Sequence, residues 1–148
     1  MKKLTTILLS AALLISTSSF AGKGEEISEA IKTAFAKSFS SAKNVNWKKT
    51  NDLYFANFQV ERSKLFAAFN ESGDLVAVSR TIDISQVPLA LARAIQKDYA
   101  DYYLSGSVTE MVLEGNTSYY FNAESKTRSL ELKGNANGEI SVEKKTKK

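Results

Sequence analysis

The chain contains no cysteine and no histidine, and only one proline among its 148 residues. Without cysteine there can be no disulfide bond, no thiolate nucleophile and no cysteine-based zinc site. Without histidine the chain lacks the usual general base and the commonest ligand of transition metals. Glycine-rich phosphate-binding loops are missing as well. We therefore predict a protein that is not an enzyme and that holds no cofactor.

The oxygen-bearing side chains offer little chemistry in their place. Residues 70–74 surround a glycine with possible cation ligands, but the segment is too short for a calcium-binding loop and is typical of a turn. The glutamates of the second half alternate with apolar residues, as on the solvated side of a sheet: Glu110, Glu114, Glu131, Glu139 and Glu143. We expect neither a metal site nor a catalytic residue.

The N-terminus has the three parts of a secretory signal peptide. Lys2 and Lys3 are basic, residues 4–15 are mostly apolar, and small residues occupy positions Ser19 and Ala21. A helix of about 12 residues is roughly 18 Å long, much shorter than the roughly 30 Å of a bilayer's hydrocarbon core. We therefore predict cleavage after Ala21, so that 1–21 is a signal peptide, and a periplasmic or secreted protein without stable membrane insertion.

Charge is nearly balanced after the predicted cleavage. The full chain has a net charge of +4, and loss of Lys2 and Lys3 lowers it to +2 in the remaining 127 residues. This small excess, together with export, argues against nucleic acid as a partner. Lysines crowd the C-terminus, where we expect a solvated basic tail over residues 145–148.

Hydrophobic periodicity divides the rest of the chain into helices and strands. Apolar residues recur every three or four positions over 27–39 and again over 88–99, which predicts two amphipathic helices. Each helix is followed by four short alternating segments, predicted as strands at 43–49, 53–61, 64–70, 75–82, 107–114, 117–124, 127–133 and 139–144. Gly73 and Gly138 mark turns in which a positive φ is cheap.

The two halves have related sequences. A shift of 60 residues pairs the apolar positions of the helices and a shift of 65 pairs the strands; the matched pairs include Ala30–Ala90, Ala34–Ala94, Tyr54–Tyr119, Asn70–Asn135 and Gly73–Gly138. We predict two tandem units, 22–84 and 85–144, that form one compact domain. The predicted fold is α+β, with two helix-plus-four-strand repeats forming one antiparallel sheet and both helices on one face.

Several positions resemble the PepSY-like family of small exported bacterial proteins. They are Val45-x-Trp47, Tyr54-x-Ala56-x-Phe58, Ala67-Ala68-Phe69-Asn70 with Gly73, and Val87-Pro88 ahead of a helix that ends in Tyr99. The family is similar to the β-lactamase inhibitor protein, so the resemblance implies a tandem pair of helix-plus-sheet units. It carries no inhibitory residue over, and the second unit departs from it, with Met111 or Val112 at the position of the tryptophan. Because fold does not imply function, inhibition is an analogy only.

Trp47 is the only tryptophan, and it follows Val45 at strand spacing. We expect it to lie on the core face of its strand and to pack under the first helix. Its expected neighbours there are Phe35 and Phe39, because these residues lie on the apolar face of that helix.

The alternation of the strands sends several aromatic side chains away from the helices. Phe55, Phe66 and Tyr120 are each one residue out of step with the core positions of their strand, and Asn57 and Gln59 share their side. Aromatic residues framed by amides are typical of protein-binding surfaces. We therefore single out these five residues as candidates for binding a partner.

Two alternatives stay open for this face. The two faces of the sheet could be reversed, or a loop at 100–106 could cover the aromatic side chains. The pairing within the first hairpin also depends on its turn. A two-residue turn at Arg62-Ser63 would place Gln59 opposite Phe66, which predicts the register of these strands.

The favoured function is a non-enzymatic exported module that binds or inhibits another protein of the cell envelope through the open sheet face. One alternative is a structural or stress-related envelope protein without a discrete ligand. Another is a carrier of small molecules or lipids, which would need a sizeable cavity.

Overall fold

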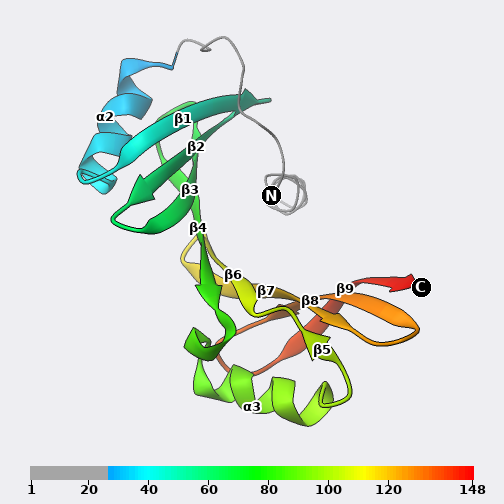
Figure 1. Cartoon of the computed structure of the whole chain (residues 1–148). Coiled ribbons are helices and arrows are strands. Elements are labelled where there is room, and N and C mark those ends of the chain that lie inside the picture. The colour runs from blue at the N-terminus through cyan, green and yellow to red at the C-terminus, as the bar shows by residue number, and fades with distance from the viewer. Residues whose placement is uncertain (1–26) are drawn as a thin grey trace.

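The computed structural model describes residues 27–148. The predicted signal peptide and its cleavage site after Ala21 lie outside the described residues. The first half contains α2 (Glu29–Ser38), β1 (Lys43–Thr50), β2 (Leu53–Val60), β3 (Ser63–Asn70) and β4 (Leu75–Asp83). The second contains a short 3₁₀ helix, η1 (Ile84–Gln86), followed by α3 (Leu89–Asp98), β5 (Tyr103–Leu104), β6 (Ser107–Leu113), β7 (Asn116–Glu124), β8 (Arg128–Gly134) and β9 (Ile140–Lys147) (Figure 1).

All the described strands belong to one antiparallel sheet. Their order is β1-β2-β3-β4-β6-β7-β8-β9, and the short β5 pairs with β7. Figure 1 shows that the sheet bends between its two halves, with α2 and α3 on the outer side of the bend. The predicted α+β fold, one antiparallel sheet with both helices on one face, is confirmed.

Strand β4 explains why both helices lie on the same face. Its ladder with β6 runs without a bulge from Ala77 to Asp83. Val78 and Ile82, four residues apart on this strand, therefore point to the same side. Val78 packs against the core beneath α2, and Ile82 belongs to the core beneath α3.

Local sequence sets where the helices begin. The hydroxyl of Ser28 accepts a hydrogen bond from the backbone N–H of Ile31 at 3.4 Å, which caps α2. Before α3, Asp83 and Gln86 form a capping box around η1, and Pro88 immediately precedes the helix. No side chain caps α3 itself, whose N-cap residue is Pro88.

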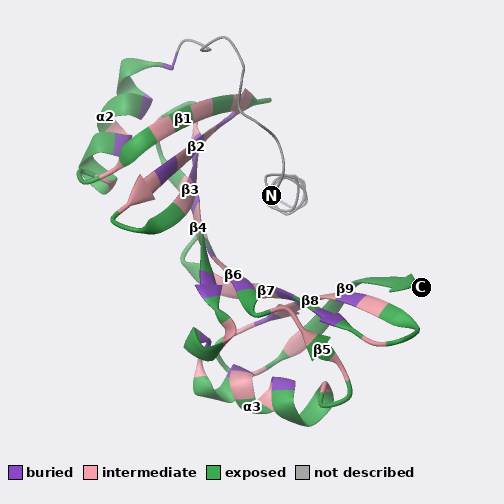
Figure 2. Cartoon of the chain, in the orientation of Figure 1, coloured by how far each residue is buried: buried purple, intermediate pink, exposed green. Residues whose placement is uncertain are grey.

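Each helix covers its own hydrophobic core (Figure 2). Beneath α2 the buried side chains are Ile27, Ile31, Phe35, Tyr54, Ala56, Phe58, Ala67 and Phe69. Trp47 is half-buried and lies edge-on to Phe35, with ring centroids 5.2 Å apart, as predicted. The ring of Phe39 packs instead on Phe58, at 4.6 Å.

A polar row crosses the helix face between the two cores. Arg80 of β4 lies directly opposite Glu110 of β6 and forms an ion pair with it at 2.5 Å. Glu110 in turn lies opposite Tyr119 of β7, a buried residue of the second core. Burial raises the pKa of Tyr119, and the negative charge of Glu110 and a hydrogen bond to it raise it further.

The two asparagine–glycine turns have the same internal contacts. The side-chain oxygen of Asn70 accepts the N–H of Asp74 at 2.8 Å, and that of Asn135 accepts the N–H of Glu139 at 3.1 Å. Gly73 and Gly138 have φ values of 86° and 89°, and each turn touches the helix of its own half. Glycine is needed at both positions because other residues are strained at a positive φ.

Three details differ from the sequence predictions. The β2–β3 turn is Glu61-Arg62, because Val60 pairs with Ser63, so the predicted turn at Arg62-Ser63 is wrong. Strand β5 was not predicted. The expected basic tail at 145–148 is also wrong, because β9 continues to Lys147 and its last residues pair with β8.

Candidate functional site

The candidate site is the sheet face opposite α2 and α3, called the open face below. Strand alternation and register place all five predicted residues on it: Phe55, Asn57, Gln59, Phe66 and Tyr120. The helix-facing positions of β2 are Tyr54, Ala56 and Phe58, so the predicted assignment of the two faces holds. All five side chains are partly exposed.

The register determines which of these residues meet. Asn57 lies opposite Phe66, and Gln59 lies opposite Lys64. The predicted pairing of Gln59 with Phe66 is therefore wrong by two residues, although the shift of two keeps every side chain on its predicted face. Phe55 lies opposite Ala68 and so stands diagonally from Phe66.

Residues that lie opposite one another on successive strands form rows across the sheet. Phe66 and Tyr120 belong to two neighbouring rows of this kind on the open face. The row of Phe66 continues through Ser79 and Met111 to Ser118. In the next row Thr109 lies opposite Tyr120, which lies opposite Lys133. The ammonium of Lys133 lies 5.7 Å from the centroid of the Tyr120 ring. Met111 and Lys133 thus join the predicted residues at the centre of the open face.

An apolar cluster on this face was not singled out as a site from the sequence. Leu53, Ala68 and Ala77 are buried there, with relative exposures of 6%, 3% and 8%. Phe55, Val76 and Leu113 pack against them. Strand parity already placed Leu53 and Ala68 on this face, but their burial depends on neighbours from β4 and β6. The cluster extends the apolar centre of the open face.

The segment around β5 does not supply the apolar cover that was considered for this face. Tyr102 and Leu104 pack against the core beneath α3, on the opposite side of the sheet. Tyr103, between them, is 77% exposed. β5 lies beside the end of β7, because Tyr103 pairs with Glu124 and Leu104 with Ala123.

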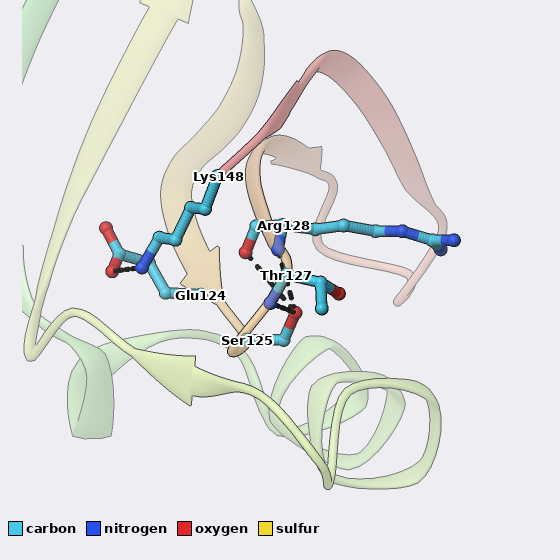
Figure 3. A network of polar contacts seen from close by, with 5 residues as sticks. All are labelled: Glu124, Ser125, Thr127, Arg128 and Lys148. Atoms are coloured by element: carbon cyan, nitrogen blue, oxygen red, sulfur yellow. Dashed lines mark hydrogen bonds and ion pairs between the residues drawn. The ribbon is translucent and has the colours of Figure 1, made fainter.

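At the far end of the face, carboxylates are paired with lysines. Lys144 contacts Glu131 at 3.2 Å, and Lys148 contacts Glu124 at 2.7 Å. Figure 3 shows the second pair beside the β7–β8 turn. In this turn the hydroxyl of Ser125 accepts the backbone N–H of Arg128 at 3.1 Å, which fixes the turn. These groups define the edge of the open face and leave its centre to aromatic, amide and lysine side chains.

The described part of the chain shows little that resembles a reactive centre. Among residues 27–148, no group of three or more acidic side chains is arranged to hold a metal ion. The carboxyl of Asp83 has its pKa held below the ordinary value by hydrogen bonds from the hydroxyl and backbone N–H of Ser85. This shift belongs to the cap of η1, so it has a structural cause.

An open hollow of about 290 Å³ lies at β8 and β9, with charged side chains in its lining: Lys133, Gly134, Asn135, Glu139, Ile140, Ser141 and Glu143. An open hollow with charged side chains offers little to a lipid tail. Within residues 27–148 no helix has both the length and the apolar character needed to cross a bilayer.

The geometry can now be compared with that of known proteins. A BLIP-like protein from Bacteroides fragilis superposes with a TM-score of 0.70 at 17% identity, covering 84% of this chain and 88% of the other. The chain has a BLIP-like fold. A candidate periplasmic protein from Bacteroides eggerthii gives the same TM-score at 16% identity, with 83% and 90% of the two chains covered.

A DUF2874 family protein from Bacteroides uniformis matches equally well, with a TM-score of 0.70, 15% identity and 82% and 90% coverage. No family profile and no curated protein sequence matches the chain. The resemblance seen in the sequence is thus confirmed for the BLIP-like fold.

Proposed function

We propose that this protein is an exported binding module that engages another protein of the cell envelope through its open face. The observation that carries the proposal is the group of aromatic side chains on a sheet face that neither helix covers. Phe55, Phe66 and Tyr120 lie there with the apolar cluster beside them. If the partner is an enzyme, the bound module would occupy its surface and could inhibit it.

The composition of the face supports a protein partner. Interfaces commonly have an apolar, aromatic centre and a polar rim that excludes water. Here the centre consists of Phe66, Met111 and Tyr120, and amides such as Asn57 and Gln59 lie on the same face. The BLIP-like name of a structural neighbour agrees with protein binding. A small-molecule carrier is less well supported, because the hollow at β8 and β9 is open to solvent and has charged side chains in its lining.

The test compares capture by variants of the two faces. We expect Phe66→Ser and Tyr120→Ser to weaken capture of an envelope protein by about ten-fold or more, since an interface aromatic can carry about 2 kcal/mol. The matched control is Leu89→Ser, which removes an exposed apolar side chain from α3 on the other side of the sheet. It should leave capture unchanged. Quantitative mass spectrometry of the captured proteins is the readout.

Thermal stability separates binding from folding. Each of the open-face variants should shift the melting temperature by no more than the roughly 4–8 °C that about 1 kcal/mol represents in a domain near this size. A larger shift would assign the residue to the fold rather than to a partner. Equal capture by wild type and both open-face variants would instead favour a structural envelope protein.

We also propose that 1–21 is a cleaved signal peptide and that 22–84 and 85–144 are tandem units of one compact domain. The three-part N-terminal pattern and the candidate periplasmic neighbour support export. The equivalent turn contacts at Gly73 and Gly138 support the repeat. N-terminal sequencing of the exported protein should find Gly22 first, and an intact Met1 would contradict both cleavage and the proposed location.

A further inference from the structure

The charges on the open face are distributed unevenly. Lys48, Lys64 and Lys133 extend from β1, β3 and β8 on this side of the sheet. Strands β1, β2, β3 and β6 place no carboxylate on it, as their residues and register show. The two glutamates that β7 and β8 contribute are each bound to a lysine of the C-terminal segment. On β9, Glu143 accepts a hydrogen bond from the hydroxyl of Ser141, which lies opposite Lys133, so one carboxylate stands near Lys133 at the edge of the face. The central part of the face is therefore positively charged.

The remaining carboxylate of β4 on this side has a structural role. Asp83 ends the strand and accepts hydrogen bonds from the backbone N–H and the hydroxyl of Ser85, at 2.9 and 2.5 Å. It is thereby committed to the cap of η1. Lys64 and Lys133, by contrast, form no ion pair with any residue in 27–148. Their charge is available to a ligand.

These lysines lie close to the aromatic centre. Lys64 of β3 lies opposite Gln59 of β2. It is two residues before Phe66 on the same strand, so both side chains point to the open face. Lys133 lies over the ring of Tyr120. Ammonium groups therefore stand beside both aromatic residues, Lys64 near Phe66 on β3 and Lys133 opposite Tyr120 on β8. Such a surface complements a partner that presents carboxylates on both sides of an apolar side chain.

We propose that the occupant of the open face is an acidic protein segment, in which Asp or Glu side chains flank an apolar anchor. The anchor would lie between Phe66 and Tyr120, above the side chain of Met111, which is only 5% exposed, and the carboxylates would meet Lys64 and Lys133. A second copy of this chain fits poorly, because a face-to-face pair would bring the same lysines together. This inference rests on the proposed function and specifies the chemistry of its partner.

The test uses a random peptide library displayed on phage as the probe, selected against the whole mature protein. Enriched peptides are then synthesised and titrated against three proteins. These are wild type, the double variant Lys64→Glu/Lys133→Glu, and the matched control Lys37→Glu/Lys97→Glu. The control changes the net charge equally but lies on the exposed sides of α2 and α3.

We expect the enriched peptides to combine acidic residues with an aromatic or aliphatic one. The open-face charge reversal should weaken their binding by about ten-fold or more, since like charges then face each other, whereas the helix-face control should not. Binding should also weaken between about 0.1 M and 1 M salt, where the Debye length falls from about 10 Å to about 3 Å.

Two other results would overturn the inference in different ways. Neutral or basic peptides that lose affinity with Phe66→Ser but not with the lysine reversal would show a binding face with a non-acidic partner. That result would leave the proposed function standing. Peptides indifferent to both changes, or no enrichment at all, would contradict the acidic partner and the binding face together.

Discussion

At the residue scale, two glycines with the same turn conformation have different surroundings. A Cβ added to Gly73 would lie 3.4 Å from the carbonyl oxygen of Ala30, an ordinary contact. One added to Gly138 would lie only 2.8 Å from the carbonyl oxygen of Ala90, so the helix backbone would have to move. The positive φ penalises alanine at both positions, but only the second adds a clash with backbone atoms.

We therefore predict that Gly138→Ala destabilises the protein more than Gly73→Ala. The strain of a positive φ alone costs about 1–2 kcal/mol, which is the expected loss at Gly73. Displacement of α3 should add to this loss at Gly138. Urea unfolding measures both variants, and an equal loss would mean that the second turn can move away from its helix.

Trp47 provides the second prediction. It packs edge-on to Phe35 but lies on the edge strand β1 and is only half-buried. Trp47→Ala should cost about 2–3 kcal/mol, less than the roughly 3–5 kcal/mol typical of fully buried aromatic residues, because part of the ring is already in water. Denaturant unfolding followed by circular dichroism gives the value. A loss below about 1 kcal/mol would remove Trp47 from the core of the first half.

The pKa of Tyr119 leads to a prediction about alkaline stability. Burial and the negative charge of Glu110 raise this pKa, so the folded state favours the neutral phenol. The associated stability is present below the unfolded pKa of about 10 and is lost as the pH rises through the folded value. Tyr119→Phe should therefore reduce the loss of stability above pH of about 10. Tyr103→Phe, at an exposed tyrosine, is the matched control for the loss of a phenol hydroxyl.

At the element scale, the sequence of the β2–β3 hairpin predicts which face each side chain occupies but does not predict the strand register. Alternation alone assigns Tyr54, Ala56 and Phe58 to the core, because the period of two survives any shift by an even number of residues. The turn itself contains neither glycine nor asparagine. Glu61 adopts a φ of 53°, which no local signal predicts. Face assignment was therefore available from the sequence, and the exact register was not.

The hairpin register can be tested at the turn. Glu61→Gly should stabilise the protein by about 0.5–1 kcal/mol, because glycine adopts a positive φ without strain. Arg62→Gly is the control, since Arg62 does not have a positive φ and glycine there only adds disorder to the unfolded chain. A stabilising Arg62→Gly with a neutral Glu61→Gly would argue for the turn at Arg62-Ser63.

Two other elements depend on contacts between distant segments. β5 contains only two residues, and it exists because Leu104 and Tyr103 pair with β7. β9 extends through a lysine-rich stretch because β8 supplies backbone partners as far as Arg128. Local charge predicted a tail there, but ladder hydrogen bonds outweigh modest repulsion between exposed lysines.

At the scale of the whole molecule, one continuous sheet connects two separate cores. The link is the β4–β6 ladder, which pairs seven residues on each strand from Ala77 to Asp83 and from Leu113 to Ser107. On the helix face, the Arg80–Glu110 pair lies between the cores. Such a ladder transmits loss of one half to the other, since unfolding the second half turns β4 into an edge strand that is paired only with β3.

We therefore expect the two halves to unfold together. Leu91 is fully buried in the second core, and Leu91→Ala should cost about 2–5 kcal/mol. Trp47, which reports on the first core, should show the same shift of its fluorescence transition as the circular dichroism of the whole chain. An unchanged Trp47 transition in this variant would mean that the halves unfold independently.

The candidate site was partly visible in the sequence. Strand alternation placed Phe55, Phe66 and Tyr120 on one face, because each is one residue away from the core positions of its strand. Strand alternation also places Lys133 on this face, but its contact with Tyr120 and the contribution of Met111 were not predicted, since they depend on the order of β4, β6, β7 and β8 in the sheet. A single strand shows which side a residue faces, whereas its neighbours across the sheet come only from the assembled ladder.

Within residues 27–148, the meandering strand order also makes β1 and β9 the two edge strands of the sheet. Both edges carry several lysines: Lys43, Lys48 and Lys49 on one, and Lys144, Lys145 and Lys147 on the other. Joining copies edge to edge would bring these ammonium groups together within the spacing of adjacent strands. The ends of the sheet thus discourage the chain from growing into fibrils, even when many copies are crowded into a small volume.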